Sequence, residues 1–208
     1  MTPATRRARA RRGEGDLLRA DILAAAERLL IQTGDEGAVS IRAIADAAGV
    51  TPPSIYLHFA DKTELLAAVS EVRFRDLDRS MAEAAAAASS PLEALWARGR
   101  AYVRFGLENP EHYRILFMTR PGQDRPVKEE GDLPGLTAFG HLVEEVAGCM
   151  DAGAIAAGDP FLVATSLWTS VHGITSLLIA RPDFPWPDLD CLMGLVVEVQ
   201  NKGLQAPG

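Results

Sequence analysis

The chain has 208 residues, 48% of them hydrophobic and 6% aromatic, which is enough apolar material for a folded core and excludes a largely disordered protein. Its formal net charge is −7 at pH 7, yet residues 1–62 hold nine Lys or Arg against eight Asp or Glu and so carry +1, leaving −8 for the remainder. An acidic body with a basic end fits a protein that meets a polyanion at that end.

The first residues form a basic arm. The first twelve contain no acidic residue and include Arg6, Arg7, Arg9, Arg11 and Arg12. We expect residues 1–15 to be disordered, and the sequence leaves open whether they touch DNA. A charged start without an apolar run is not a signal peptide, and later apolar stretches are interrupted by His172, Arg181 and several prolines. We therefore expect a cytoplasmic protein with no membrane span, in which Cys149 and Cys191 are reduced thiols.

Apolar residues at three- and four-residue spacing predict helices along the rest of the chain. Gly34 and Gly49 end the first two, Ser40 caps the second, and Asp61 with Glu64 forms a capping box that opens a long one. The expected helices span residues 16–33, 41–48, a short stretch from 53, 61–88, 91–108, 111–118, 136–152, 160–180 and 188–202, with a loop at 119–132. Strand alternation is not convincing anywhere, so the chain is predicted to be all-α with about nine helices.

The segment VTPPSIYLHFADK, residues 50–62, places two prolines at the start of a short helix. The first amides of a helix have no intrahelical acceptor, so proline is tolerated there, and Pro53 is expected to be the first helical residue. Ile55 and Phe59 are four residues apart and share the buried face of a helix expected to have two turns, which leaves Leu57 outside.

This short helix follows another across a glycine turn. Ala45 is small enough for a close helix contact, and Gly49 supplies the left-handed residue between the two helices. The arrangement is the helix-turn-helix pattern, in which the second helix enters the major groove of DNA. An ordinary αα-hairpin has the same spacing.

Residues 22–69 resemble the N-terminal domain of TetR-type transcriptional regulators, most closely in SIRAIA (40–45), AGV (48–50), IY (55–56), HF (58–59) and Lys62 with ELL (64–66). NPEHYRILF (109–117) is similar to a segment common after the fifth helix of the family. GDP (158–160) and WTSVHG (168–173) resemble the C-terminal subgroup named for its Trp, His and Gly. Two residues depart from the pattern: Leu57 stands where many members have an aromatic residue, and Leu30 where Phe is usual.

The resemblance implies a DNA-binding domain at residues 16–62 and a ligand-binding and dimerisation domain at 63–208. It also implies a homodimer that binds a palindromic operator, a double-stranded DNA partner, and is released by a small molecule. Tyr56, His58 and Lys62 carry groups suited to phosphate oxygens. Leu57 and Pro53 suit thymine methyl groups, and Arg42 suits guanine or a phosphate. The expected DNA-binding set is completed by Thr51, Pro52 and Ser54.

Apolar helices with a few polar groups in the C-terminal part predict a ligand pocket. The expected lining is Trp96, Arg100, Val103, Phe105, Phe139, Thr165, Trp168, Thr169 and His172. The same pattern describes a core that contains a hydrogen-bonded histidine. A stripe of small residues on one helix and an apolar stripe on the last helix predict a four-helix dimer interface, as in the family. Its expected residues are Ser166, Ser170, Gly173, Leu177, Leu189, Leu192, Met193 and Val196.

Two other classes of function remain as alternatives. His141, Glu144 and Glu145 have ligand-like spacing on one helix, but no second His/Glu pair supports a metal site. No nucleophile elbow, phosphate loop or cysteine cluster is found, so we expect neither an enzyme nor a cofactor. A helical protein–protein adaptor with a vestigial DNA motif is the remaining alternative.

Overall fold

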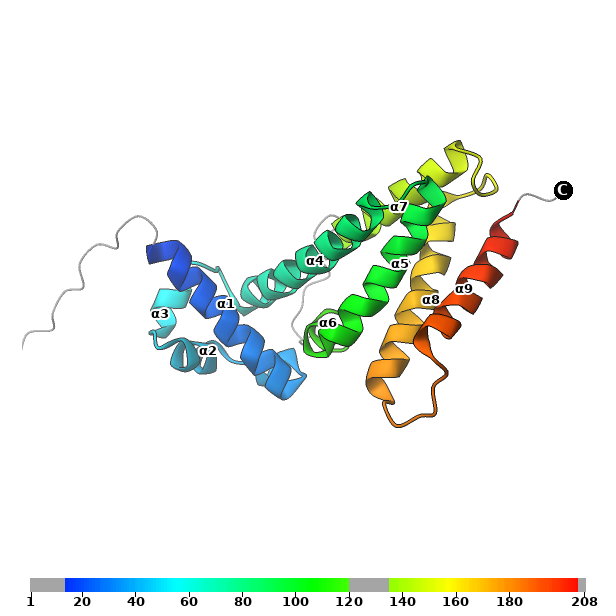
Figure 1. The fold of residues 1–208 in the computed structure, drawn as a ribbon. Helices are drawn as coiled ribbons and strands as arrows, with labels where there is room; N and C mark the ends of the chain where they lie inside the picture. Colours follow the sequence, from blue (N-terminus) through cyan, green and yellow to red (C-terminus); the bar gives the residue numbers. More distant parts are fainter. Residues whose placement is uncertain (1–13, 120–134, 206–208) are drawn as a thin grey trace, which may run out of the picture. The chain divides into compact units, whose positions relative to one another are not determined.

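The computed structural model describes residues 14–119 and 135–205, and these residues are almost entirely helical (Figure 1). They form α1 (Glu14–Thr33), η1 (Glu36–Ala38), α2 (Ile41–Ala48), α3 (Pro52–Ile55), α4 (Lys62–Ala86), α5 (Pro91–Glu108), α6 (Pro110–Phe117), α7 (Leu136–Asp151), α8 (Pro160–Ala180) and α9 (Leu189–Leu204). The nine α-helices within these ranges confirm the all-α prediction. Most of the predicted arm and most of the predicted 119–132 loop lie outside the described residues.

Local capping explains why most helix ends lie where the sequence predicts. The Ser40 hydroxyl accepts a hydrogen bond from the Ala43 amide, and Asp159 caps α8 in the same way. Glu64 accepts from the amide of Ala60, and its own amide donates to Asp61, which is the expected capping box in a shifted form. The bounds of α5 and α8 agree with the prediction because each follows such a cap and opens on a proline.

Two details near α3 differ from expectation. The helix begins at Pro52, one residue before the predicted start, since neither of the first two helical positions needs an amide proton. It is also only one turn long, and Tyr56 to His58 continue as a turn. The 3₁₀ turn η1 was not predicted; the side chain of Asp35 caps it by accepting from the Gly37 amide at 2.7 Å.

The described chain divides into two compact units. Unit 1 contains residues 14–70 with Met118 and Thr119, and unit 2 contains residues 71–117 and 135–205. The division lies inside α4, eight residues beyond the domain boundary expected at 62/63. In unit 1, α1 packs on α2 and α2 on α3, burying Ile22, Ala26, Ile44 and Ile55.

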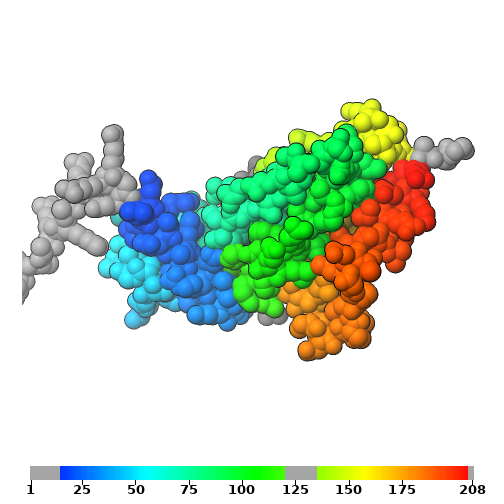
Figure 2. Space-filling view, in the orientation of Figure 1, coloured from blue at the N-terminus to red at the C-terminus, as the bar shows by residue number. Residues whose placement is uncertain are grey.

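Unit 2 is built around α5, which packs against α6, α7 and α8. Gly106 lets α5 pack closely on α8: a β-carbon there would lie 2.3 Å from Cγ2 of Thr175. In Figure 2, α9 (orange to red) forms part of the surface beside α5 (green).

By length and composition alone, one helix in the described ranges, α8, could cross a membrane, with 22% of its most apolar window buried. The expectation that no stretch reaches this length was wrong on that criterion. Pro160 is the first residue of α8 and Arg181 follows its last, so neither interrupts it, and His172 alone does not make it polar. In this fold α8 packs against α5 and α7.

Candidate DNA-binding and ligand-binding sites

The α2–turn–α3 unit has the geometry of a helix-turn-helix. Gly49 ends α2 in the left-handed conformation, at φ 67° and ψ 31°, and the amide of Val50 donates to the carbonyl of Ala45 at 2.9 Å. Ile55 and Phe59 are buried, and the guanidinium of Arg19 lies 4.9 Å from the centre of the Phe59 ring. The core side of α3 is therefore held against the rest of unit 1.

The opposite side of α3 faces solvent, as predicted. Leu57 is 82% exposed and Tyr56 54% exposed. Truncating either side chain would therefore remove little buried apolar area from unit 1. The other expected DNA contacts lie on this side of α3 or beside it: Arg42, Thr51, Pro52 and Pro53 are exposed, and Ser54 and His58 are half-buried. The Ser54 and Thr51 hydroxyls are hydrogen-bonded to each other at 3.0 Å.

Lys62 is placed differently from the prediction. Its Nζ donates to the main-chain carbonyls of Glu36 at 2.9 Å and Val39 at 3.0 Å, and the side chain is partly buried. Two of its three N–H groups therefore hold η1 to the start of α4. The sequence did not predict this structural role, because the local capping signals gave no hint of η1. The third N–H is not used by these two contacts, and the phosphate contact of Lys62 stays a prediction.

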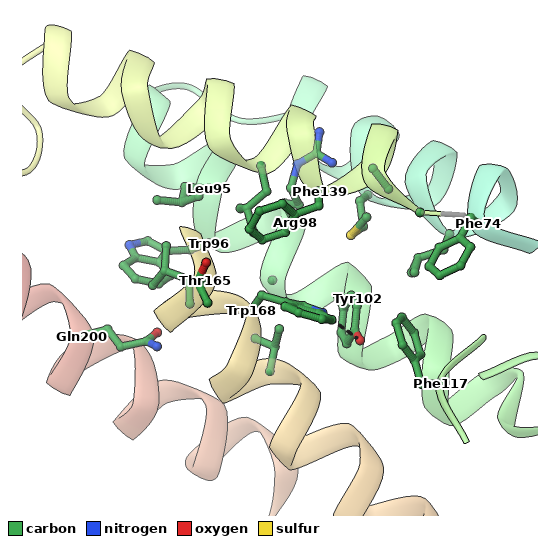
Figure 3. A pocket seen from close by; sticks show the side chains of 18 of the residues that line it. Phe74, Leu95, Trp96, Arg98, Tyr102, Phe117, Phe139, Thr165, Trp168 and Gln200 are labelled. Carbon is green, nitrogen blue, oxygen red and sulfur yellow. Dashed lines mark hydrogen bonds between the residues drawn. The ribbon is translucent and has the colours of Figure 1, made fainter. Parts of the chain in front are cut away.

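Unit 2 contains a cavity of about 550 Å³ between α4, α5, α6, α7, α8 and α9 (Figure 3). Aromatic rings from five of these helices line it: Phe74, Trp96, Tyr102, Phe117, Phe139, Phe161 and Trp168. A volume of this size fits a drug-sized molecule.

Four of the nine predicted ligand residues line this cavity, namely Trp96, Phe139, Thr165 and Trp168. The other five do not. Val103 and Phe105 are buried in the core around α5, and Arg100 and Thr169 face solvent. The sequence did not single out Phe74, Phe117 or Gln200, because a helix's own periodicity does not say which distant helix it meets.

His172 belongs to a hydrogen-bond network behind Trp168 and does not line the cavity. Its Nδ1 lies 2.7 Å from the Tyr113 hydroxyl and 3.0 Å from the Tyr102 hydroxyl. The Trp168 indole N–H donates to the same Tyr102 oxygen at 3.4 Å. Burial lowers the pKa of His172 and raises that of Tyr113 to about 12, so at pH 7 the imidazole is neutral and the Tyr113 hydroxyl keeps its proton. These contacts match the alternative of a hydrogen-bonded core histidine, and a contact between His172 and a ligand stays a prediction.

A second buried network lies around Arg98. Its Nε donates to Glu145 at 2.7 Å and its Nη1 to Asp78 at 3.3 Å. The ring Nδ1 of His141 lies 2.9 Å from Asp78. His141 and Glu145, considered above as metal ligands, are thus engaged in ionic and hydrogen-bond contacts, and no group of residues suited to a metal occurs in residues 14–119 and 135–205.

The predicted dimer residues divide into two groups. On α8, Ser166 and Leu177 are exposed, and a β-carbon on Gly173 would meet no atom within 4 Å. On α9 the predicted register is partly wrong. Met193 and Val196 line the cavity, Leu189 packs on the core, and the exposed apolar residues are instead Leu195 and Val199. Both sides of α9 are apolar, so periodicity could not choose between them. Ser170 is half-buried and accepts from Gln200 at 2.9 Å, and Leu192 is half-buried.

Two family models match the sequence. Residues 22–69 match the model of bacterial regulatory proteins of the tetR family, and residues 95–192 match that of the tetracyclin repressor-like C-terminal domain. The first match contains the helix-turn-helix, and the second contains most of α5, all of α6 to α8 and most of the cavity-lining residues. No curated protein matches the chain closely enough to be counted as a relative.

Solved structures with the same fold match nearly the whole chain. A protein of unknown function from Rhodococcus sp. RHA1 is 27% identical, with a TM-score of 0.75 over 91% of this chain and 96% of that one. A TetR family transcription regulator from Marinobacter aquaeolei VT8 is 20% identical, with a TM-score of 0.74 over 95% and 100%. The transcriptional regulator FadR from Bacillus subtilis, solved in complex with stearoyl-CoA, is 18% identical, with a TM-score of 0.70 over 89% and 99%.

The two family models agree with each other and with the helix-turn-helix geometry of unit 1. They confirm the resemblance seen in SIRAIA and the residues that follow it; the finer likeness to the Trp-His-Gly subgroup stays a prediction. The chain belongs to the TetR family of transcription regulators, which are not enzymes.

Proposed function

We propose that the protein is a ligand-responsive repressor, which binds a palindromic operator as a homodimer in the cytoplasm and is released by an apolar small molecule. The observation that carries the proposal is the apolar cavity of about 550 Å³ in unit 2. The same chain has exposed side chains, Tyr56 and Leu57, on the helix-turn-helix of unit 1. The match to a C-terminal domain described as tetracyclin repressor-like supports the same function.

The DNA-binding surface is proposed to be the exposed side of the α2–α3 unit. Leu57, with Pro53 beside it, would contact thymine methyl groups. The Tyr56 hydroxyl and the His58 ring would bind phosphate oxygens, with Thr51, Pro52 and Ser54 at the backbone. Arg42 is exposed and lies one residue into α2, where its guanidinium can reach a guanine or a phosphate. Lys62 holds η1 to the start of α4, and its remaining N–H would bind a phosphate oxygen.

The dimer interface is proposed to be an apolar face of α8 and α9. On α8 it contains Leu162, Ser166, Gly173 and Leu177, and on α9 Leu192, Leu195 and Val199. Leu162, Leu177, Leu195 and Val199 are each at least 50% exposed, a larger apolar area than scattered surface residues explain. Two copies of a helix pair would form a four-helix interface, and a two-fold axis would match a palindromic operator.

The effector is proposed to bind in the cavity and to favour a dimer whose α3 helices are wrongly spaced for the two half-sites. A ligand shifts such an equilibrium only through its difference in affinity for the two forms, so release by about a thousandfold requires about 4 kcal/mol of preference. The helix α4 provides a covalent route, because it contributes Phe74, Leu77 and Met81 to the cavity and its first residues to unit 1.

The test combines genomic selection with ligand screening. Genomic fragments that the protein retains at moderate salt identify an operator, and thermal-shift screening identifies a ligand. The proposal expects sequence-selective binding that the ligand weakens. An adaptor with a vestigial motif would show no sequence preference. Unchanged operator affinity at saturating ligand would mean that unit 2 is a dimerisation scaffold only.

A further inference from the structure

The polar groups of the cavity show which kind of ligand it can accept. Among the described residues, four lining residues besides the two tryptophans carry polar side-chain atoms: Arg98, Tyr102, Thr165 and Gln200. Of the two indole N–H groups, that of Trp168 donates to Tyr102, and that of Trp96 is buried without a hydrogen-bond partner. Since the rest of this lining is apolar, the hydrogen-bonding capacity left over on these groups determines what head group a ligand can bring.

Within residues 14–119 and 135–205, Arg98 is the one charged residue in the lining, and its charge is already matched. Glu145 and Asp78 both accept from its guanidinium, so one cation lies between two carboxylates. Figure 3 shows the guanidinium on the side of Arg98 away from Trp168, so mainly the aliphatic stem faces the cavity. A carboxylate in the cavity would be a third anion beside a single cation, and removing it from water would be unfavourable.

Tyr102 is also engaged. Its hydroxyl lies within hydrogen-bond distance of Tyr113, His172 and the Trp168 indole N–H. A hydroxyl has one donor and two acceptor sites, so these three contacts use its capacity. A ligand gains no new hydrogen bond at this position.

Unused hydrogen-bonding capacity lies on the side of Trp168 where Gln200 and Thr165 are found. Gln200 donates from Nε2 to Ser170, but its carbonyl and second N–H have no recorded partner among the described residues. Thr165 donates to the Phe161 carbonyl and keeps its oxygen lone pairs. Figure 3 shows Gln200 extending from α9 toward Thr165 and Trp96, on the opposite side of Trp168 from Phe74 and Phe117. This position offers both acceptors and a donor, and no positive charge.

We infer that the cavity binds an uncharged, ring-containing molecule with one hydroxyl or amide head group, which Gln200 recognises, and that it rejects carboxylates of the same shape. The rings of Phe74, Phe117, Phe139 and Trp168 enclose the body of the ligand by edge and face contacts. The inference rests on the proposed function in taking this cavity as the effector site.

The test uses three probes with one ring system: biphenyl, biphenyl-methanol and biphenyl-carboxylate, the last two substituted at the same para position. Calorimetric titration of the full-length protein at neutral pH is expected to give an alcohol affinity about a hundredfold or more above that of the carboxylate. Gln200→Leu is expected to weaken the alcohol about five- to tenfold and to change biphenyl itself by less than about twofold.

Gln205→Leu is the matched control, because Gln205 is exposed just beyond the end of α9 and does not line the cavity; it is expected to change none of the three affinities. Retained biphenyl binding shows that the Gln200 variant is folded. Carboxylate binding as tight as that of the alcohol, no measurable alcohol binding at millimolar concentration, or an unaffected Gln200→Leu variant would each overturn the inference. These titrations contain no DNA and therefore test the ligand preference of the cavity alone. If that preference is as expected but a ligand does not release the protein from its operator, the result counts against the proposed function and not against this inference.

Discussion

Gly106 on α5 and Thr175 on α8 lie so close that residue 106 has no room for a side chain: a β-carbon would be 2.3 Å from Thr175 Cγ2 and 2.9 Å from Tyr113 Cδ2. Gly106→Ala should therefore destabilise unit 2 by about 1–3 kcal/mol through overpacking, although alanine favours helix. Gly99→Ala is the matched control on the same helix, because its β-carbon would make an ordinary contact of 3.6 Å with Val171. Urea unfolding should show Gly99→Ala as neutral or stabilising; equal losses for the two would contradict the packing argument.

Lys62→Met should lower stability, and the salt dependence of DNA binding tests its predicted phosphate contact separately. The substitution removes the donor for the Glu36 and Val39 carbonyls, which costs about 1–3 kcal/mol. The comparison is Arg42→Ala, an exposed position where stability should change by less than about 0.5 kcal/mol. If Arg42 binds a phosphate, its loss should reduce the slope of log K against log salt by about one unit. A slope reduced by the same amount for Lys62→Met, measured by fluorescence anisotropy, would show that Lys62 binds a phosphate as well; an unchanged slope would leave Lys62 with the structural role alone.

Leu57→Ala should affect DNA recognition and spare the fold. Leu57 is 82% exposed, so its truncation should change the free energy of unfolding by less than about 0.5 kcal/mol, while preference at one or two A·T positions is relaxed. Ile55→Ala in the same segment has the opposite expectation, a loss of about 2–5 kcal/mol, because Ile55 is fully buried. Binding-site selection with Leu57→Ala that returns the wild-type sequence preference would show that Leu57 reads no base.

Leu195→Glu should convert the dimer to monomers, because it places a charge in the proposed α8–α9 face where the leucine is 56% exposed. Leu17→Glu on α1 is the control: Leu17 is 69% exposed but lies in unit 1. Sedimentation at micromolar concentration should give a dimer for the wild type and for Leu17→Glu, and a monomer for Leu195→Glu. A wild-type monomer would remove the proposed interface.

Stability should fall as the pH falls below 6.5, with His172 as one cause. Burial lowers its pKa in the folded state below the ordinary 6.5, so the unfolded chain binds the proton first. The stabilisation is fully present above pH 6.5 and is lost as the pH falls through the folded pKa. His172→Gln should flatten this dependence in urea unfolding. Tyr113→Phe should lower stability but keep its dependence on pH, since burial and not the Tyr113 hydrogen bond lowers the pKa of His172. An unchanged profile for His172→Gln would assign the pH dependence to other groups.

Much of the local structure could be predicted from the sequence because its causes are local. A cap followed by a proline defines the start of α5 at Ser90 and Pro91, and of α8 at Asp159 and Pro160. The left-handed Gly49 and the pair Ile55 and Phe59 make the helix-turn-helix visible within a few residues. The family resemblance in the same segment depends on these residues, so it too could be recognised in advance.

The sites depended on contacts between distant segments. Lys62 carries the same charge whether it faces a phosphate or caps η1, and only the folded chain brings Glu36 and Val39 to it. α9 is apolar on both sides, so hydrophobic periodicity gave no reason to place Met193 inside and Leu195 outside. Four residues of the cavity were predicted because they lie on apolar helices with conspicuous aromatic residues: Trp96, Phe139, Thr165 and Trp168. Phe74, Phe117 and Gln200 were not, because which face of a helix borders a cavity is decided by the packing of six helices and not by the sequence of any one of them.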